Sequence, residues 1–260
     1  MLRRAKELLG YTISAADSEQ IGQIHDFYFD TEDWEIRYVV VDIGSWLFGR
    51  RVLLAPDTLQ KPDWENKIQP VNLTKAQIKD SPPVDFDKPI SRQYEADLHQ
   101  HYNWPTYWGG GGLPYTTVAN VMPTGAPMAE PSPLNQLPAE VVEGLQQSEE
   151  SHVQSIRELT NHALEAIDGS IGHITDCFID DENWTIRYLI VDTGHWRPGN
   201  QVLIPQTTVD NADWVGGNIY VKLTQEQVKQ SPAYEPNRPL DQAYTAELDA
   251  RYDDHEGRKS

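Results

Sequence analysis

One stretch of nine residues occurs twice in this chain, and it constrains the fold more than any other feature. The copies are WEIRYVVVD at residues 34–42 and WTIRYLIVD at residues 184–192. The match continues at an offset of 150 between residues 21–102 and 171–252, and a turn just before it is one residue shorter in the second copy. A length change confined to a turn is what a duplicated β-domain tolerates. The chain is therefore expected to fold as two copies of one small domain.

Short apolar segments separated by turn residues predict mainly β-structure in each copy. In the first copy the expected strands are 11–15, 21–29, 35–42, 52–54, 59–63 and 67–71. Five or six short strands with little helix between them favour a small barrel. We therefore predict a mainly β fold, in which an internal duplication has produced two small β-barrels.

A short helical tail is expected after each barrel. Thr74 and Thr224 each precede a Gln by three residues, which is a capping-box pattern that begins a helix. A Ser-Pro pair then ends each helix. A second helical stretch is predicted over roughly 91–101 and 241–252, where apolar residues lie four apart.

The segment between the copies differs from both of them in composition. It begins with the aromatic run at 104–108 and continues with four glycines and many prolines, as is typical of a linker. The aromatic run is expected to pack on the first barrel. The predicted organisation is a first barrel with its helical tail at 1–102, a linker at 103–150 and a second barrel with its tail at 151–260.

Several motifs together resemble the PRC-barrel domain, the small β-barrel named for the photosynthetic reaction-centre H subunit. They are Gly22-x-x-x-Asp26, the acidic turn 30–33, the repeated stretch 34–42 and the strand 52–54. The resemblance covers about residues 5–72 and 156–222, and the tails are similar to those of bacterial two-repeat PRC-barrel proteins of unknown role. It implies two PRC-type barrels that act in scaffolding or protein–protein contact, and it implies no activity.

Charge and cysteine usage limit the partners and the compartment. The formal net charge is −19, so the chain repels nucleic-acid phosphates and we expect no nucleic-acid partner. Cys177 is the only cysteine, which rules out an intrachain disulfide and fits a reducing compartment. No signal-peptide pattern and no apolar run long enough to cross a membrane is present. A cytoplasmic protein without a transmembrane segment is expected.

Three groups of polar residues were weighed as chemical sites, and each has a simpler interpretation. The acidic turns 30–33 and 180–183 lack the spacing of a calcium loop. His99 and His101 have no further predicted zinc ligand nearby. Asp26 and Asp30, which recur as Asp176 and Asp180, would lie roughly 13 Å apart along a strand, so turn capping or arginine pairing explains them better than acid–base work. Since common catalytic motifs are also missing, we predict no enzyme activity, no cofactor and no metal site.

The third predicted strand of each copy is apolar on both faces, so one face needs a cover beyond the barrel interior. We predict that the copies pack on each other as a pseudo-dimer within the chain. Trp46 and Trp196 lie in glycine-flanked loops, where an exposed aromatic would anchor an interface. The candidate interface residues are Trp46, Trp196, Val39, Val41, Leu189 and Val191.

The predicted function is a non-catalytic protein–protein interaction or scaffold module built from the two barrels. Its protein partner is not identified by the sequence, and a homo-oligomer is compatible with it. The alternative is a protein that binds a small ligand or a metal ion in a cleft between the barrels. A cleft lined by tryptophans and a few convergent polar groups would favour that alternative.

Overall fold

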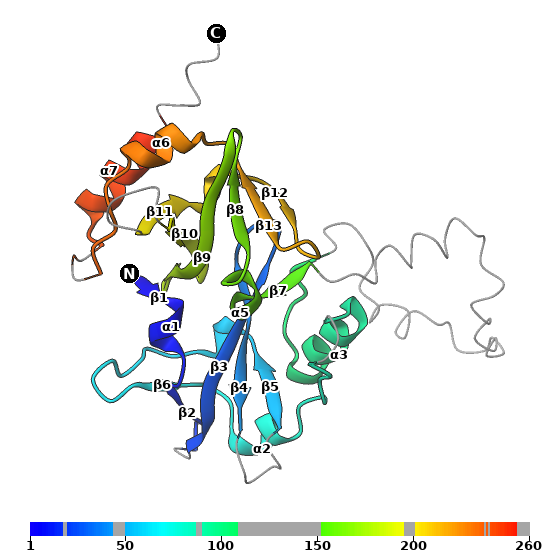
Figure 1. Cartoon of the computed structure of the whole chain (residues 1–260). Helices are drawn as coiled ribbons and strands as arrows, with labels where there is room; N and C mark the ends of the chain where they lie inside the picture. Colours follow the sequence, from blue (N-terminus) through cyan, green and yellow to red (C-terminus); the bar gives the residue numbers. More distant parts are fainter. Residues whose placement is uncertain are drawn as a thin grey trace, which may run out of the picture. The chain divides into compact units, whose positions relative to one another are not determined.

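The computed structural model contains two mixed β-sheets, one for each copy of the repeat (Figure 1). It describes residues 1–17, 20–43, 50–86, 90–108, 152–194, 201–236, 238 and 240–253. The chain divides into two compact units, one made of residues 1–79 and 152–260 and the other of residues 80–151. Both sheets belong to the first unit. The boundaries expected from the repeat, at 102/103 and 150/151, stay a prediction.

The sheet of the first copy follows the strand order β5-β4-β3-β2-β6. Its elements are β2 (Thr12–Ser14), β3 (Gln20–Asp30), β4 (Ile36–Asp42), β5 (Arg51–Leu54), the 3-10 turn η2 (Pro56–Thr58) and β6 (Ile68–Pro70). All pairs are antiparallel except β2 with β6, which is parallel. The predicted strand at 59–63 contributes only the isolated bridges of Leu59 with Val71 and of Asp63 with Ile68.

The sheet of the second copy repeats this order as β11-β10-β9-β8-β13-β12. Its elements are β8 (Ala163–Ala166), β9 (Gly169–Asp180), β10 (Thr185–Asp192), β11 (Gln201–Pro205), the 3-10 turn η5 (Gln206–Thr208), β12 (Val209–Asp213) and β13 (Asn218–Val221). Here the strand next to β13 forms as β12, with one register shift between Val209 and Asn211. Asn211 and Ala212 replace Lys61 and Pro62 of the first copy, and proline cannot donate to a strand ladder. The predicted mainly β fold with two repeats is confirmed.

The copies exchange their first strands, which the sequence did not predict. β1 (Leu2–Arg4) precedes the first sheet but pairs with β9 of the second, and β7 (Val153–Ser155) precedes the second sheet but pairs with β3 of the first. In Figure 1, blue β1 lies beside green β9. A short helix follows each exchanged strand, α1 (Ala5–Leu8) and α5 (Ile156–Leu159).

The backbones also meet where the pseudo-twofold axis passes between the copies. The N–H of Ile36 donates to the carbonyl of Trp184 at 2.7 Å, and the N–H of Ile186 donates to the carbonyl of Trp34 at 2.9 Å. The two bonds are equivalent, because Ile36 corresponds to Ile186 and Trp34 corresponds to Trp184 at the offset of 150 residues. The predicted pseudo-dimer within the chain is therefore confirmed.

The repeated glycine at the start of the long strand has a packing reason. A Cβ at Gly22 would lie 2.1 Å from the carbonyl oxygen of Asp42, and one at Gly172 would lie 1.9 Å from that of Asp192. Real carbon and oxygen atoms do not approach so closely. Only glycine therefore allows the third strand to cross the second at this point.

The helical tails form as the capping patterns predict. α2 (Lys75–Lys79) and α6 (Gln225–Gln230) follow Thr74 and Thr224, and Thr224 forms a full capping box with Gln227. In the second copy, α7 (Gln242–Asp253) covers the outer face of β10 and β11. The Tyr188 hydroxyl donates to Asp249 at 2.7 Å, and the Tyr252 hydroxyl donates to the carbonyl of Leu203 at 3.1 Å. The tail helix thus covers part of the outer apolar face of β10 and β11.

The second unit contains the helix α3 (Arg92–Tyr102), which Ser91 caps at its N-terminus. The aromatic run at 104–108 folds back along this helix. Trp104 stacks on Tyr102, the carbonyl of Pro105 bonds with Nδ1 of His99 at 2.8 Å, and the guanidinium of Arg92 lies 4.8 Å from the ring centre of Trp108. The run therefore contacts the tail helix that follows the first barrel.

Candidate functional site

Two buried aspartates hold the exchanged segments in place. Asp26 on β3 accepts hydrogen bonds from the hydroxyl of Ser155 and from the N–H of Arg157 at 3.3 Å. Asp176 on β9 accepts from Nε of Arg4 at 3.1 Å and from the N–H of Lys6 at 3.2 Å. Each carboxylate thus binds the start of the short helix that belongs to the other copy. This capping across copies explains why the aspartate recurs in the sequence.

Burial changes the acidity of Asp26. Its side chain is almost completely buried, and desolvation raises its pKa from 3.8 to about 6, although the bonds from Ser155, Phe27 and Arg157 oppose the rise. The charged form is therefore costly at this position, and the three donors are what make it tolerable. Nearly all the accepting capacity of the carboxylate is used inside the protein.

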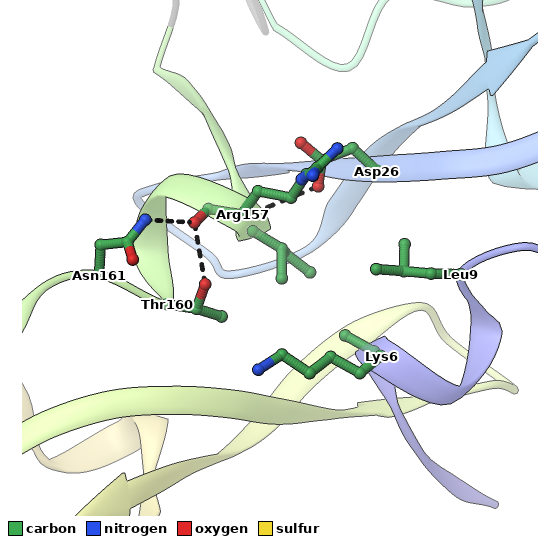
Figure 2. Close-up of a pocket in the computed structure, with 8 residues that line it drawn as sticks. Lys6, Leu9, Asp26, Arg157, Thr160 and Asn161 are labelled. Carbon is green, nitrogen blue, oxygen red and sulfur yellow. Dashed lines mark hydrogen bonds between the residues drawn. The ribbon is translucent and has the colours of Figure 1, made fainter.

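A cavity of about 310 Å³ lies between the helices α1 and α5, at the junction of the two copies (Figure 2). Its lining residues are Ala5, Lys6, Leu9, Asp26, Ile156, Arg157, Thr160 and Asn161. Figure 2 shows the Lys6 side chain extending from α1 toward Thr160 on the opposite wall. The hydroxyl of Thr160 and the amide of Asn161 both donate to the carbonyl of Arg157, at 2.9 and 3.1 Å.

Two cations border this cavity outside ion-pair distance of a carboxylate, although the charge of Arg157 still acts on Asp26. In the part of the chain that the structure describes, neither the ammonium of Lys6 nor the guanidinium of Arg157 lies within ion-pair distance of an acidic group. Instead, Arg157 lies 2.7 Å from Nε2 of His25. Burial lowers the pKa of His25, and the positive charges of Arg51 and Arg157 lower it further. Arg51 and Arg157 thus place positive charge beside the carboxylates of Asp26 and Asp42 at this end of the junction.

The two walls of the cavity differ although they come from equivalent segments. Lys6 and Arg157 occupy the same position of the repeat, and both are basic. Leu9 on the α1 side is replaced by Thr160 on the α5 side, and Gly10 is replaced by Asn161. One wall is therefore apolar beyond its lysine, whereas the other offers an amide and a hydroxyl.

Aromatic rings fill another part of the junction. Trp34 of the first copy stacks on Phe29 at 5.3 Å between ring centres and lies 6.5 Å from Trp214 of the second copy. Trp34 and its counterpart Trp184 both have a positive φ, at 62° and 55°. This backbone conformation turns the chain between the second and third strands. These tryptophans contribute to the packing between the copies.

Three exposed apolar residues lie on the second copy, along its strands β8 and β13 and in the turn before β13. Ile167 is 70% exposed, Val215 is fully exposed and Tyr220 is 40% exposed. Tyr220 pairs with Glu165 on β8 and Ile167 follows the end of that strand, whereas Val215 lies in the β12–β13 turn, near the start of β8. We call these three residues the copy-two patch. The equivalent residues of the first copy are Ala16, Glu65 and Pro70.

The structure places the sequence-predicted interface residues in two classes. Val39, Val41, Leu189 and Val191 are fully buried; Val39 lies opposite Phe27 and Leu54 in the sheet. They belong to the core of their own copies and offer no contact surface to another protein. Trp46 and Trp196 lie outside the described residues, so their loops stay a prediction.

The polar groups weighed from the sequence have structural partners. Arg37 pairs with Glu35 at 2.8 Å and with Asp33 in the first acidic turn. His99 bonds with a carbonyl, and the thiol of Cys177 is fully buried with a pKa raised by desolvation. Within the described ranges, no three His, Cys, Asp or Glu side chains are grouped as a metal site would need. The same ranges contain no helix that could span a membrane.

The cavity was missed by the sequence reasoning, although a signal for it was present. Residues 1–10 align with 152–161 at an offset of 151 rather than 150, because the turn that follows differs by one residue. Comparing those ten positions would have shown paired basic residues beside Leu9 and Thr160. Their convergence depends on the strand exchange, however, and no local pattern encodes that.

The comparisons with known proteins agree with the duplicated fold. A family model described as the PRC-barrel domain matches residues 2–69 and 163–228, which together are just over half of the chain. An uncharacterized protein from Deinococcus radiodurans is 35% identical over 80 residues. The aligned part is 30% of this chain and 26% of that protein, so the match spans about a quarter of the relative's length.

Proposed function

The chain belongs to the PRC-barrel family, and from this premise we propose that it is a non-catalytic module that binds another protein through the copy-two patch. The observation that carries the proposal is the difference between the two copies at this surface. Here Ile167, Val215 and Tyr220 replace an alanine, a glutamate and a proline.

The surroundings of the patch indicate the chemistry of the partner. Glu165 adjoins Tyr220 on β8, and the exposed Asp210 and Asp213 lie on the edge strand β12. Apolar residues surrounded by acidic ones suit a partner segment that carries both apolar and basic side chains. Among the neighbouring acids, Asp210 has one internal partner, the ammonium of Lys222 at 3.5 Å. A basic partner would compete with that exposed pair at little cost.

Several finer features belong to this proposal. A cytoplasmic location fits the single buried cysteine. A second copy of this chain is a weaker candidate partner, because two surfaces with the same acidic surroundings repel each other.

The test substitutes the three residues of the copy-two patch with residues chosen to resemble those at the equivalent positions of the first copy. We expect Ile167→Ala, Val215→Glu and Tyr220→Ser, combined in one chain, to reduce partner binding by at least about tenfold, because apolar and aromatic anchors carry most interface energy. At position 220 the substitute is serine, not the proline that the first copy has there, because proline would remove a backbone N–H from β13. The measurement is affinity capture from the source organism with quantitative mass spectrometry of the bound proteins.

The matched control is Glu65→Ala at the corresponding turn of the first copy. A partner that is recovered by the native chain and by the control, but not by the triple variant, would support the proposal. Recovery of the same proteins by all three chains would contradict it.

A further inference from the structure

The cavity between α1 and α5 has no role in the protein contact proposed above. We infer that it binds a small organic anion, in which a carboxylate or phosphate group is held between Lys6 and Arg157. The apolar part of the ligand would lie against Leu9, Ala5 and Ile156. Both basic residues line the cavity, and they come from opposite walls.

Charge is the first argument for an anion. The chain carries 40 acidic and 21 basic residues, so basic side chains that form no close ion pair stand out. Two of them line the same cavity. The repulsion between an anion and the rest of the chain is screened beyond about 10 Å in ordinary buffers, so the local potential is set by the two adjacent cations and the one hydrogen-bonded carboxylate of Asp26. A cationic ligand would instead meet Lys6 and Arg157 directly.

Asp26 does not reverse this preference. Its two oxygens accept hydrogen bonds from Ser155, Phe27 and Arg157, so they are not available to a ligand. The N–H groups at the start of α5 are used by the same bonds and are not part of the proposed site. The groups that remain for an anion are the ammonium of Lys6, the guanidinium of Arg157 and the second N–H of the Asn161 amide.

The size and the walls of the cavity limit the ligand further. A volume of about 310 Å³ accommodates on the order of ten non-hydrogen atoms, at about 30 Å³ for each water-sized group. The apolar wall at Leu9 suits a short hydrocarbon chain or one aromatic ring. The ligand class is therefore a small carboxylate or phosphate ester with an apolar body.

Two probes that share a phenyl ring but differ in their anionic group show whether the site binds a carboxylate or a phosphate. Benzoate and phenyl phosphate would be titrated into the full-length protein, with benzyl alcohol as the neutral control and benzylamine as the cationic control. Calorimetry at low salt gives the Kd, and two-dimensional NMR of the backbone amides locates the site. We expect saturable binding of at least one anion, with shifts at residues 5–9 and 156–161, and no saturable binding of the two controls.

Single substitutions then test the assigned contacts. Lys6→Gln and Arg157→Gln should each raise the Kd by about tenfold, the loss expected for one charge-assisted bond. Asn161→Asp should weaken anion binding strongly, whereas Asn161→Ala should change it by less than about threefold. Lys61→Gln is the matched control, because Lys61 is also exposed but lies outside the cavity lining.

Three results would overturn the inference. They are no saturable binding of either anion up to about 10 mM, amide shifts that lie outside the two segments, or Kd values unchanged by Lys6→Gln and Arg157→Gln. The substituted side chains are exposed, so folding of the variants can be verified by their NMR spectra. None of these variants alters the copy-two patch, so either proposal can fail without the other.

Discussion

At the residue scale, one buried carboxylate couples the junction to pH. Asp26 has a pKa of about 6 in the folded chain, against 3.8 for an ordinary aspartate. The folded state therefore keeps this proton to a higher pH than the unfolded state does. Stability from this group is greatest below about pH 4, falls as the pH rises to about 6, and stays constant above that.

We predict that Asp26→Asn removes this dependence. Relative to the variant, the native chain should lose up to about 3 kcal/mol of unfolding free energy between pH 4 and pH 6, since one pKa unit corresponds to about 1.4 kcal/mol. Denaturant titrations of both chains at several pH values measure the difference in unfolding free energy. The contributions of the carboxylates that both chains share cancel in this difference. The exposed Asp57→Asn controls for the loss of one charge. A difference that does not change with pH would contradict the assigned pKa.

At the element scale, three-residue strands join the copies. β1 pairs with β9 over Leu2–Arg4, and the carbonyl of Met1 accepts from the N–H of Asp181 at 2.9 Å. Because hydrogen-bonded pairs alternate in an antiparallel ladder, Arg3 and Ile179 form the next bonded pair. Arg3 also contacts the ring of Trp64 and the carboxylate of Asp181 through its side chain.

Two substitutions at Arg3 separate the ladder from the side chain. Arg3→Ala removes the side-chain contacts only, whereas Arg3→Pro also removes the N–H that bonds to β9. We expect proline to destabilise the chain by about 2–3 kcal/mol more than alanine does, as measured by urea titration. Gln154→Pro and Gln154→Ala repeat the comparison on β7. Equal effects of proline and alanine at both positions would show that the exchanged strands add little stability.

At the scale of the whole molecule, the exchange makes the two copies one folded unit. Each copy lacks one strand of its own sheet and receives it from the other. The connection between the copies is then needed to bring them together but not to hold them together. The exchanged strands, the bonds of Asp26 and Asp176, and the contact of Trp34 with Trp214 all cross the junction.

Cleavage of the segment between the copies tests this conclusion. A specific protease site inserted after Gly110 should cut the chain into two fragments that stay associated at micromolar concentration. Size-exclusion chromatography in native buffer should give one peak, and in denaturant it should give two. Separate elution of the fragments in native buffer would show that the junction depends on the covalent connection.

The sequence by itself determined the duplication, most strands, the capped helices and the family, because each depends on local patterns that recur in register. Strand alternation and the Thr-x-x-Gln caps involve neighbours only a few residues apart. The tertiary structure alone decided which sheet receives β1 and β7, since a three-residue strand pairs equally well with either long strand in local terms. It also decided that Val39 and Leu189 are core residues, and that Lys6 and Arg157, 151 positions apart, line one cavity.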